Sequence, residues 1–159
     1  MQAIVEAMAE GDVEAVARLR LAAFFEGTGR TLEEDITALR GLIAGDGFEA
    51  AFVARLGGSP IGSCLFVRNE NDPAHDLTPW LAGLVDNKFY RGRGVGAALL
   101  RAVEAHAASV GVSRLYLYTW QARRFYETLG WTAVEAFKQD GEPMVLMARE
   151  LASYSVPAR

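Results

Sequence analysis

The chain has 159 residues, of which 51% are hydrophobic and 23% charged, and its formal net charge is −4 at pH 7. These values are typical of one folded domain with a buried core, and they exclude a disordered chain. No apolar run approaches the roughly 20 residues of a membrane span, and residues 1–11 lack the features of a secretion signal, so we expect no membrane partner.

The first part of the chain predicts one short strand and two helices. Ile4–Ala7 is the strand, and Asp12 stands where it would cap the first helix. The apolar side of this helix is formed by Val13, Val16, Ala17, the stem of Arg20, Leu21 and Phe24. Thr31 and Glu34 have the spacing of a capping box, which predicts the start of a second helix. That helix would bury Ile36, Leu39 and Ile43.

The periodicity then changes to that of strands. Phe48–Leu56 and Ile61–Val67 are predicted strands, and Gly57-Gly58 between them indicates a hairpin. Cys64, the only cysteine, lies inside the second of these strands, which predicts an inert, buried thiol. A single cysteine excludes an internal disulfide and fits a reducing compartment, so we expect a cytoplasmic protein.

The second half continues with a loop at residues 69–79 and further strands and helices. A helix is predicted from Gly94 to Val110, and Gly111 would end it. The other predicted elements are the strands Trp80–Asp86, Arg114–Tyr118, Trp131–Lys138 and Met144–Leu151 and the helix Gln121–Leu129. The order β-α-α-β-β-β-α-β-α-β-β predicts a mixed sheet with helices on its faces. Strands 80–86 and 114–118 are joined through a helix, so they should be parallel. We expect residues 1–152 to form a single domain and residues 153–159 to be a C-terminal tail.

The segment between the strand at 80–86 and the following helix is rich in glycine and arginine. Gly92, Gly94 and Gly96 have no Cβ, so a ligand can approach the backbone, and the first amides of the helix form an anion site. Arg91 and Arg93 add forked donors suited to phosphate. Seven basic residues and one acidic residue lie in 88–124, whereas 1–87 holds fourteen acidic and six basic residues. The acidic part would suit a cationic second substrate or is simply solvated; both interpretations stay open.

Two common phosphate motifs fit this segment poorly. A P-loop requires Lys followed by Ser or Thr at its end, and Gly96-Ala-Ala-Leu has neither. A dinucleotide fingerprint is formally present from Gly92 to Ala97, but residues 87–91 separate it from its strand. Residues 115–119 also offer no acid to bind a ribose. A nucleotide kinase or a dehydrogenase is therefore disfavoured.

Two motifs together resemble the GNAT N-acetyltransferase superfamily. Arg91-Gly-Arg-Gly-Val-Gly96 is similar to the family's Arg/Gln-x-x-Gly-x-Gly/Ala signature, which binds the pyrophosphate of acetyl-CoA. Residues 119–131 resemble its second signature, Ala-x-x-Phe-Tyr-Glu-x-x-Gly-Phe/Trp, through Ala122, Phe125, Tyr126, Glu127, Leu129, Gly130 and Trp131. The order of elements matches along nearly the whole chain. The resemblance implies a GNAT-like α/β fold, with about seven strands in a central mixed, mostly antiparallel sheet flanked by about four helices.

The resemblance also implies a set of site residues, with acetyl-CoA as co-substrate. The coenzyme would lie along Leu84, Val85 and Asp86, over Arg91, Gly92, Arg93, Gly94, Val95 and Gly96, and near Thr119. Thr119 stands where the family often has Asn, and Asp86 where it often has Val. Tyr126 would protonate the leaving thiolate, because a phenol of pKa near 10 can protonate a thiolate whose thiol has a pKa of about 8.5. The alternative for Tyr126 is a place in the core alone, since it lies on an apolar helix face.

The general base is left open by the sequence. In many relatives an acid occupies the start of the coenzyme strand, where this chain has Trp80. Histidine exchanges protons readily near neutral pH, so His75 is one candidate. The others are Asp76, Glu26, Glu33 and Asp35, whereas His106 is expected to be a helix residue without a catalytic role. Trp80, Trp120 and Trp131 either line an acceptor site or pack in the core. No spaced set of His, Cys and Asp predicts a metal site.

The sequence therefore predicts an N-acetyltransferase that moves the acetyl group of acetyl-CoA to a primary amine of a small acceptor in a direct ternary complex, and the acidic part of the chain leaves a cationic acceptor open. A non-catalytic acyl-CoA-binding module and a protein N-acetyltransferase are the alternatives. We expect no nucleic-acid partner. GNAT relatives are often dimers, which leaves a homodimer open.

Overall fold

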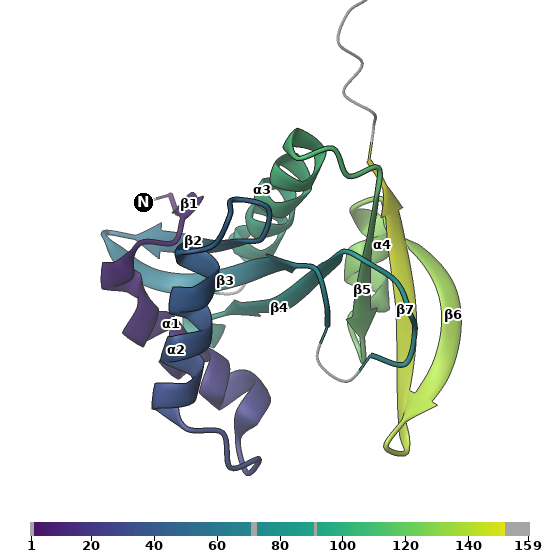
Figure 1. The fold of residues 1–159 in the computed structure, drawn as a ribbon, viewed down its shortest axis with the longest axis horizontal. Helices are drawn as coiled ribbons and strands as arrows, with labels where there is room; N and C mark the ends of the chain where they lie inside the picture. Colours follow the sequence, from purple (N-terminus) through teal and green to yellow (C-terminus); the bar gives the residue numbers. More distant parts are fainter. Residues whose placement is uncertain (1, 71–72, 91, 152–159) are drawn as a thin grey trace, which may run out of the picture. The chain divides into compact units, whose positions relative to one another are not determined.

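The computed structural model describes residues 2–70, 73–90 and 92–151 (Figure 1). Arg91 and the predicted tail at 153–159 lie outside the described residues. The helices are α1 (Val13–Arg20), α2 (Leu32–Ile43), α3 (Val95–Ser109) and α4 (Arg123–Thr128). The strands are β1 (Ile4–Ala7), β2 (Ala50–Leu56), β3 (Ser59–Val67), β4 (Trp80–Asp86), β5 (Arg114–Thr119), β6 (Thr132–Gln139) and β7 (Glu142–Glu150). Within the described residues, no helix has the length and apolar character needed to cross a bilayer.

The seven strands form one sheet in the order β1-β2-β3-β4-β5-β7-β6. The pairs β1–β2, β2–β3, β5–β7 and β6–β7 are antiparallel. β4 and β5 are parallel, with Trp80 opposite Tyr116, as a helical crossover requires. The predicted fold class, a mixed and mostly antiparallel sheet with four helices, is confirmed.

The chain divides into two compact units, and β4 and α3 each contribute residues to both. The first unit contains residues 1–66 and 83–103. In it α1 and α2 lie side by side (Figure 1) and bury Val13, Val16 and Leu39. Cys64 is fully buried on β3, as predicted, and this burial raises the pKa of the Cys64 thiol.

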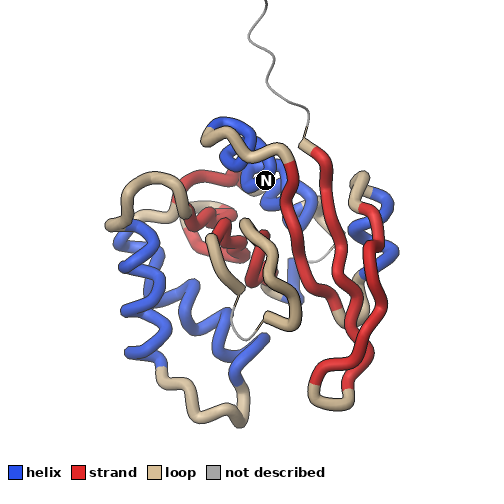
Figure 2. The backbone as a smooth tube through the Cα atoms, turned by 45° about the vertical axis from the view of Figure 1, so that its right-hand side comes forward, coloured by secondary structure: helices blue, strands red, loops and turns tan. Residues whose placement is uncertain are grey.

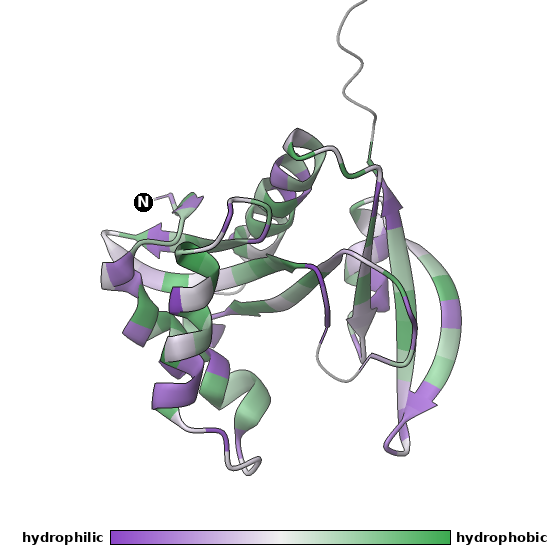
Figure 3. Ribbon diagram, viewed as in Figure 1, coloured by the Kyte–Doolittle hydropathy of each residue, from purple (hydrophilic) through white to green (hydrophobic). Residues whose placement is uncertain are grey.

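The second unit contains residues 67–82 and 104–159. Its strands β5, β7 and β6 form an antiparallel layer, visible as the long red strands in Figure 2. Leu115, Leu117 and Met147 are buried in this unit. Figure 3 shows that β7 is hydrophobic in its middle and hydrophilic at its ends, which matches buried Leu146, Met147 and Ala148. The expectation of a single domain over residues 1–152 stays a prediction.

The structure corrects several local predictions. Asp12 does not cap α1 through its side chain; its carboxylate accepts a hydrogen bond from the Ala9 amide at 2.9 Å and pairs with Arg55 on β2. The predicted helix changes at Arg20 from the α-helix α1 to a π-helical turn, η2 (Leu21–Phe25). Phe24 lies in this turn and is 43% exposed. Ile43 is 38% exposed at the last residue of α2. The Thr31–Glu34 capping box is present as predicted.

Candidate active site

The predicted coenzyme contacts Leu84, Val85 and Asp86 at the end of β4 and the glycine-rich loop belong to the first unit. β4 ends at Asp86, and the Asn87 amide donates to the Ile61 carbonyl at 2.6 Å. A 3-10 turn, η3 (Lys88–Tyr90), separates β4 from the loop. The Ala98 amide donates to the Gly94 carbonyl at 3.0 Å, so α3 begins directly after Gly94. The amides of residues 95–97 therefore precede the first intrahelical donor, the Ala98 amide, which is the arrangement that favours an anion.

The loop geometry fits the approach of a diphosphate. Gly92 has φ 83° and Gly94 has φ 75°, in the left-handed region that favours glycine. A Cβ built on either residue meets no heavy atom within 4 Å, so the backbone is open to an incoming group. Arg93 is exposed, and its guanidinium lies 5.5 Å from the Tyr90 ring centroid. Arg93 and Val95 also line a cavity of about 350 Å³ together with Gln2, Ala3, Leu56 and Ile61.

Inside β4, Gly83 interrupts the regular strand geometry. Its φ is +64°, and a Cβ built there would lie 2.5 Å from Nη1 of Arg20. The Arg20 guanidinium therefore lies directly against the backbone of β4, immediately before Leu84, Val85 and Asp86. The sequence did not reveal this contact, because Arg20 was expected to bury only its stem.

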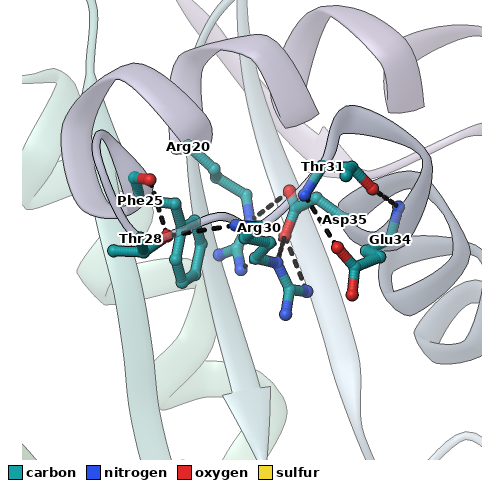
Figure 4. A network of polar contacts seen from close by, with 7 residues as sticks. All are labelled: Arg20, Phe25, Thr28, Arg30, Thr31, Glu34 and Asp35. Carbon is teal, nitrogen blue, oxygen red and sulfur yellow. Dashed lines mark hydrogen bonds and ion pairs between the residues drawn. The ribbon is translucent and has the colours of Figure 1, made fainter.

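Arg20 is fixed by a buried polar network between α1 and α2 (Figure 4). Its Nε and Nη2 atoms donate to the two carboxylate oxygens of Asp35 at 2.9 and 3.2 Å. Arg30 donates to the same carboxylate at 3.1 Å, and its guanidinium lies 4.7 Å from the Phe25 ring centroid. Asp35 is fully buried, so its carboxylate serves to hold two arginines, which argues against Asp35 as a base facing an acceptor.

A cavity of about 410 Å³ lies where β4 ends. Its walls come from α1, η2 and the segment 85–89, and they include the carboxylates of Glu26 and Asp86. Val85 and Phe89 add apolar surface, and Lys88 is the basic residue of the lining. Glu26, one of the predicted candidate bases, and Asp86, a predicted coenzyme contact, therefore border the same cavity.

Thr119 and Tyr126 belong to the second unit and are both 7% exposed. The Ala122 amide donates to Oγ1 of Thr119 at 3.1 Å, so this hydroxyl supports the turn that leads into α4. The Tyr126 ring packs edge-on against Phe125 and Trp131, with centroid distances of 5.2 and 6.2 Å. The ring of Tyr126 therefore packs in the core of its unit.

The second unit also contains a chain of hydrogen bonds that joins three titratable side chains. Nδ1 of His75 lies 2.8 Å from the Tyr118 hydroxyl, and Nε2 of His75 lies 2.9 Å from Oε2 of Glu135. Burial raises the pKa of Tyr118. His75 was one of several candidate bases in the sequence, but Tyr118 and Glu135 were not. No sequence signal could have found them, because they lie 43 and 60 residues from His75.

The three tryptophans have different environments. Trp80 is fully buried and donates from Nε1 to the Leu77 carbonyl at 2.8 Å, so it is a core residue. Trp131 is 2% exposed and donates to Glu104 at 3.0 Å. Trp120 is 54% exposed and is the tryptophan that could meet a ligand at the surface. Within residues 2–70, 73–90 and 92–151, no group of three or more His, Cys, Asp or Glu side chains is placed to hold a metal ion.

Comparison with known proteins identifies the family. Residues 13–131, more than half of the chain, match the profile of the acetyltransferase (GNAT) family. The chain therefore belongs to the GNAT acetyltransferase family and is an acyltransferase. No curated protein sequence matches it significantly.

Solved structures share the fold at low sequence identity. An N-acetyltransferase from Staphylococcus aureus Mu50 has a TM-score of 0.77 and 18% identity, over 96% of this chain and 100% of that chain. An aminoglycoside 6'-N-acetyltransferase complexed with coenzyme A has a TM-score of 0.75 and 17% identity, over 94% and 97%. The yncA protein of Salmonella typhimurium, solved with its cofactor acetyl-CoA, has a TM-score of 0.78 and 13% identity, over 99% of each chain. At these identities the likeness concerns the fold.

Proposed function

We propose that this acetyltransferase moves the acetyl group of acetyl-CoA to a primary amine of a small, cationic acceptor in a direct ternary complex. The observation that carries the choice of acceptor is the cavity of about 410 Å³ with Glu26 and Asp86 in its wall, at the end of the predicted coenzyme strand. Carboxylates in a cavity attract ammonium groups. One structural neighbour is named an aminoglycoside 6'-N-acetyltransferase, and amino sugars are cations at neutral pH.

The coenzyme supplies an activated acetyl thioester, and the chain supplies binding and proton transfer. The backbone of Leu84, Val85 and Asp86 would bind the pantetheine arm, and the segment 91–96 would bind the diphosphate, with Thr119 near the arm. Tyr126 would donate its hydroxyl proton to the leaving thiolate. These roles rest on the family resemblance and on the open loop geometry at Gly92 and Gly94.

The amine has to lose a proton before it can attack. A lysine-like amine has a pKa of about 10.4, so at pH 7 its free base lies roughly 4.6 kcal/mol above the ammonium form. A group that accepts this proton inside the site therefore contributes directly to the rate.

A thiol-release assay with acetyl-CoA tests the proposal. Kanamycin, spermidine, free amino acids and a lysine-rich peptide would be offered as separate acceptors, and we expect turnover with the small polycations. Tight coenzyme binding without turnover on any amine would instead indicate a non-catalytic module. Turnover restricted to the peptide would indicate a protein N-acetyltransferase.

Two substitutions connect this assay to the site. Glu26→Gln should raise KM for the cationic amine and leave KM for acetyl-CoA unchanged, because Glu26 lines the acidic cavity. Arg91→Ala should weaken coenzyme binding about tenfold with a smaller effect on kcat, because one forked phosphate donor is lost. Arg101→Ala, further along α3, is the control for a general loss of positive charge.

A further inference from the structure

The cavity where β4 ends contains a side-chain amine of the protein itself. Lys88, the first residue of η3, contributes to its wall together with Glu26 and Asp86. All the lining residues belong to the first unit, so the cavity lies within one compact part of the chain. The proposed function places the primary amine of the acceptor in this cavity, and the lysine side chain carries an amine of the same kind.

Lysine is rare in this chain. Lys88 and Lys138 are its two lysines among 16 basic residues, and the other fourteen are arginines. An arginine guanidinium stays protonated in proteins, so it offers no lone pair to a thioester, whereas lysine is the basic residue that acetylation modifies. Lys138 is exposed on β6, in the second unit. Lys88 is therefore the lysine of the first unit, and it lines the proposed acceptor cavity.

The surroundings of Lys88 leave its amine accessible. The residue is exposed, and its Nζ lies 5.6 Å from the Phe89 ring centroid. A contact of this kind at an exposed position is weak, and the four-carbon stem of lysine is flexible. Phe89 lines the same cavity, so the contact keeps the amine beside the space into which an acceptor would enter.

An amine that belongs to the cavity wall has an advantage over an amine in solution. An acceptor in solution loses translational and rotational freedom when it binds, whereas Lys88 has already lost this freedom through the fold. When the cavity holds no acceptor, Lys88 is the amine available there to a bound thioester.

We propose that the protein acetylates its own Lys88 when acetyl-CoA is bound and the acceptor cavity is empty. The proposal rests on the acetyl-transfer function given above. The Nζ ammonium loses one proton to water, and its lone pair forms a C–N bond with the thioester carbonyl carbon. The C–S bond breaks, and the coenzyme leaves as a thiolate. The new amide nitrogen gives up a second proton, which ends on the thiolate sulfur, so the products are acetyl-lysine and coenzyme A.

Acetylation changes the charge of the cavity. An acetylated lysine is neutral, whereas Glu26 and Asp86 keep their carboxylates. The wall then loses its basic residue, and the remaining charge is negative, which favours a cationic acceptor. An acetyl group is small compared with a cavity of about 410 Å³, so room for the acceptor remains. Self-acetylation therefore raises the affinity of the cavity for a small polycation.

Mass spectrometry detects the modification directly. The full chain is incubated with ¹³C-labelled acetyl-CoA and no acceptor, and its peptides are analysed over time. We expect an initial rate of labelling at Lys88 about tenfold above that at Lys138, which lies outside the cavity. The rate at Lys88 should not depend on protein concentration, because the reaction occurs within one chain. Saturating spermidine should slow it by occupying the cavity.

Kinetics with spermidine test the effect on acceptor binding. Wild type that has first been incubated with acetyl-CoA should have a KM for spermidine about threefold lower than untreated protein, on the scale of one exposed charge pair. Lys88→Arg keeps the charge and cannot be acetylated, so the incubation should leave its KM unchanged. Lys88→Gln is neutral and should have the lower KM without incubation. Lys138→Arg is the matched control and should behave as wild type.

The outcomes separate this proposal from the function on which it rests. Equal labelling rates at the two lysines, or a rate at Lys88 that rises with protein concentration, would overturn self-acetylation. Turnover of spermidine with Lys88 unlabelled would also overturn it, while acetyl transfer to a small polycation would stand. A protein that turns over no acceptor and labels neither lysine would overturn the proposed function itself. Labelling of Lys88 with an unchanged KM would overturn the effect on acceptor affinity. Urea unfolding of each variant at pH 7 checks that the fold is retained.

Discussion

Tyr126 is the residue proposed to complete the reaction at the leaving thiolate. Its ring packs on Phe125 and Trp131, so Tyr126→Phe removes the hydroxyl and keeps the packing. We expect kcat to fall about 10²-fold, because a positioned acid contributes on that scale, with KM for acetyl-CoA nearly unchanged. Steady-state kinetics from pH 6 to 9 would measure this. Tyr116→Phe, on β5 beside Trp80, is the control, and equal rates for both variants would remove the acid role.

Single residues were predictable from the sequence when local pattern decides their environment. Cys64 lies in an apolar strand pattern and is buried as expected. The environments of Asp35 and His75 depend on partners from other elements. Asp35 meets Arg20, fifteen residues away, and His75 meets Glu135, sixty residues away. No spacing rule connects such residues, so the candidate bases could only be sorted by the structure.

At the scale of elements, the contact between Arg20 on α1 and Gly83 on β4 makes Gly83→Ala destabilising, whereas alanine at a helical glycine should stabilise the protein. Gly83→Ala places a Cβ in the left-handed region and 2.5 Å from Nη1 of the buried Arg20. We expect it to destabilise the protein by more than about 1 kcal/mol and to lower coenzyme affinity, since the backbone at Leu84 would shift.

Gly41→Ala in α2 is the matched comparison. Gly41 is exposed inside the helix, and a Cβ built there meets nothing within 4 Å. This substitution should stabilise the protein by about 0.5–1 kcal/mol, because alanine is the better helix former. Urea unfolding measures both variants. A Gly83→Ala protein as stable as wild type, with unchanged coenzyme binding, would show that Arg20 and β4 adapt to each other freely.

Element types were well predicted, and element ends less so. Local chemistry set the Thr31–Glu34 cap and the turn at Gly57-Gly58, and both are present. The expected cap at Asp12 failed because Arg55 on β2 takes its carboxylate. The predicted start of the second strand at Phe48 is also wrong, because β2 begins at Ala50. Long-range partners decide such details, and a single sequence does not show them.

At the scale of the whole molecule, the proposed tasks divide between the two units. The first unit holds the glycine-rich loop, the end of β4 and the acidic cavity, which are groups suited to binding. The second unit holds Tyr126, the proposed acid. Glu26→Gln and Arg91→Ala should therefore act mainly on KM, and Tyr126→Phe mainly on kcat.

The stability of the whole molecule should depend on acid through its paired carboxylates. Hydrogen bonds from Arg55 lower the pKa of Asp12, and the Thr31 amide lowers the pKa of Glu34. A carboxyl group whose pKa is lowered in the folded state stabilises that state above the pKa of the unfolded chain. This contribution disappears as the pH falls through the folded value. The free energy of unfolding should therefore decline below about pH 4, the ordinary range of these groups.

Asp12→Asn tests the contribution of Asp12 to this pH dependence. The Asp12 side chain is 9% exposed and accepts two hydrogen bonds from Arg55, at 3.1 and 2.5 Å. Its loss should cost about 1–3 kcal/mol at pH 7 and flatten the decline between pH 4 and 2, because one shifted carboxyl is gone. Glu14→Gln, which breaks an exposed pair with Arg18, should change stability by less than about 0.5 kcal/mol. Urea unfolding across this pH range measures both variants. If the free energy of unfolding of Asp12→Asn declined with pH as steeply as that of wild type, the acid sensitivity would come from other carboxylates.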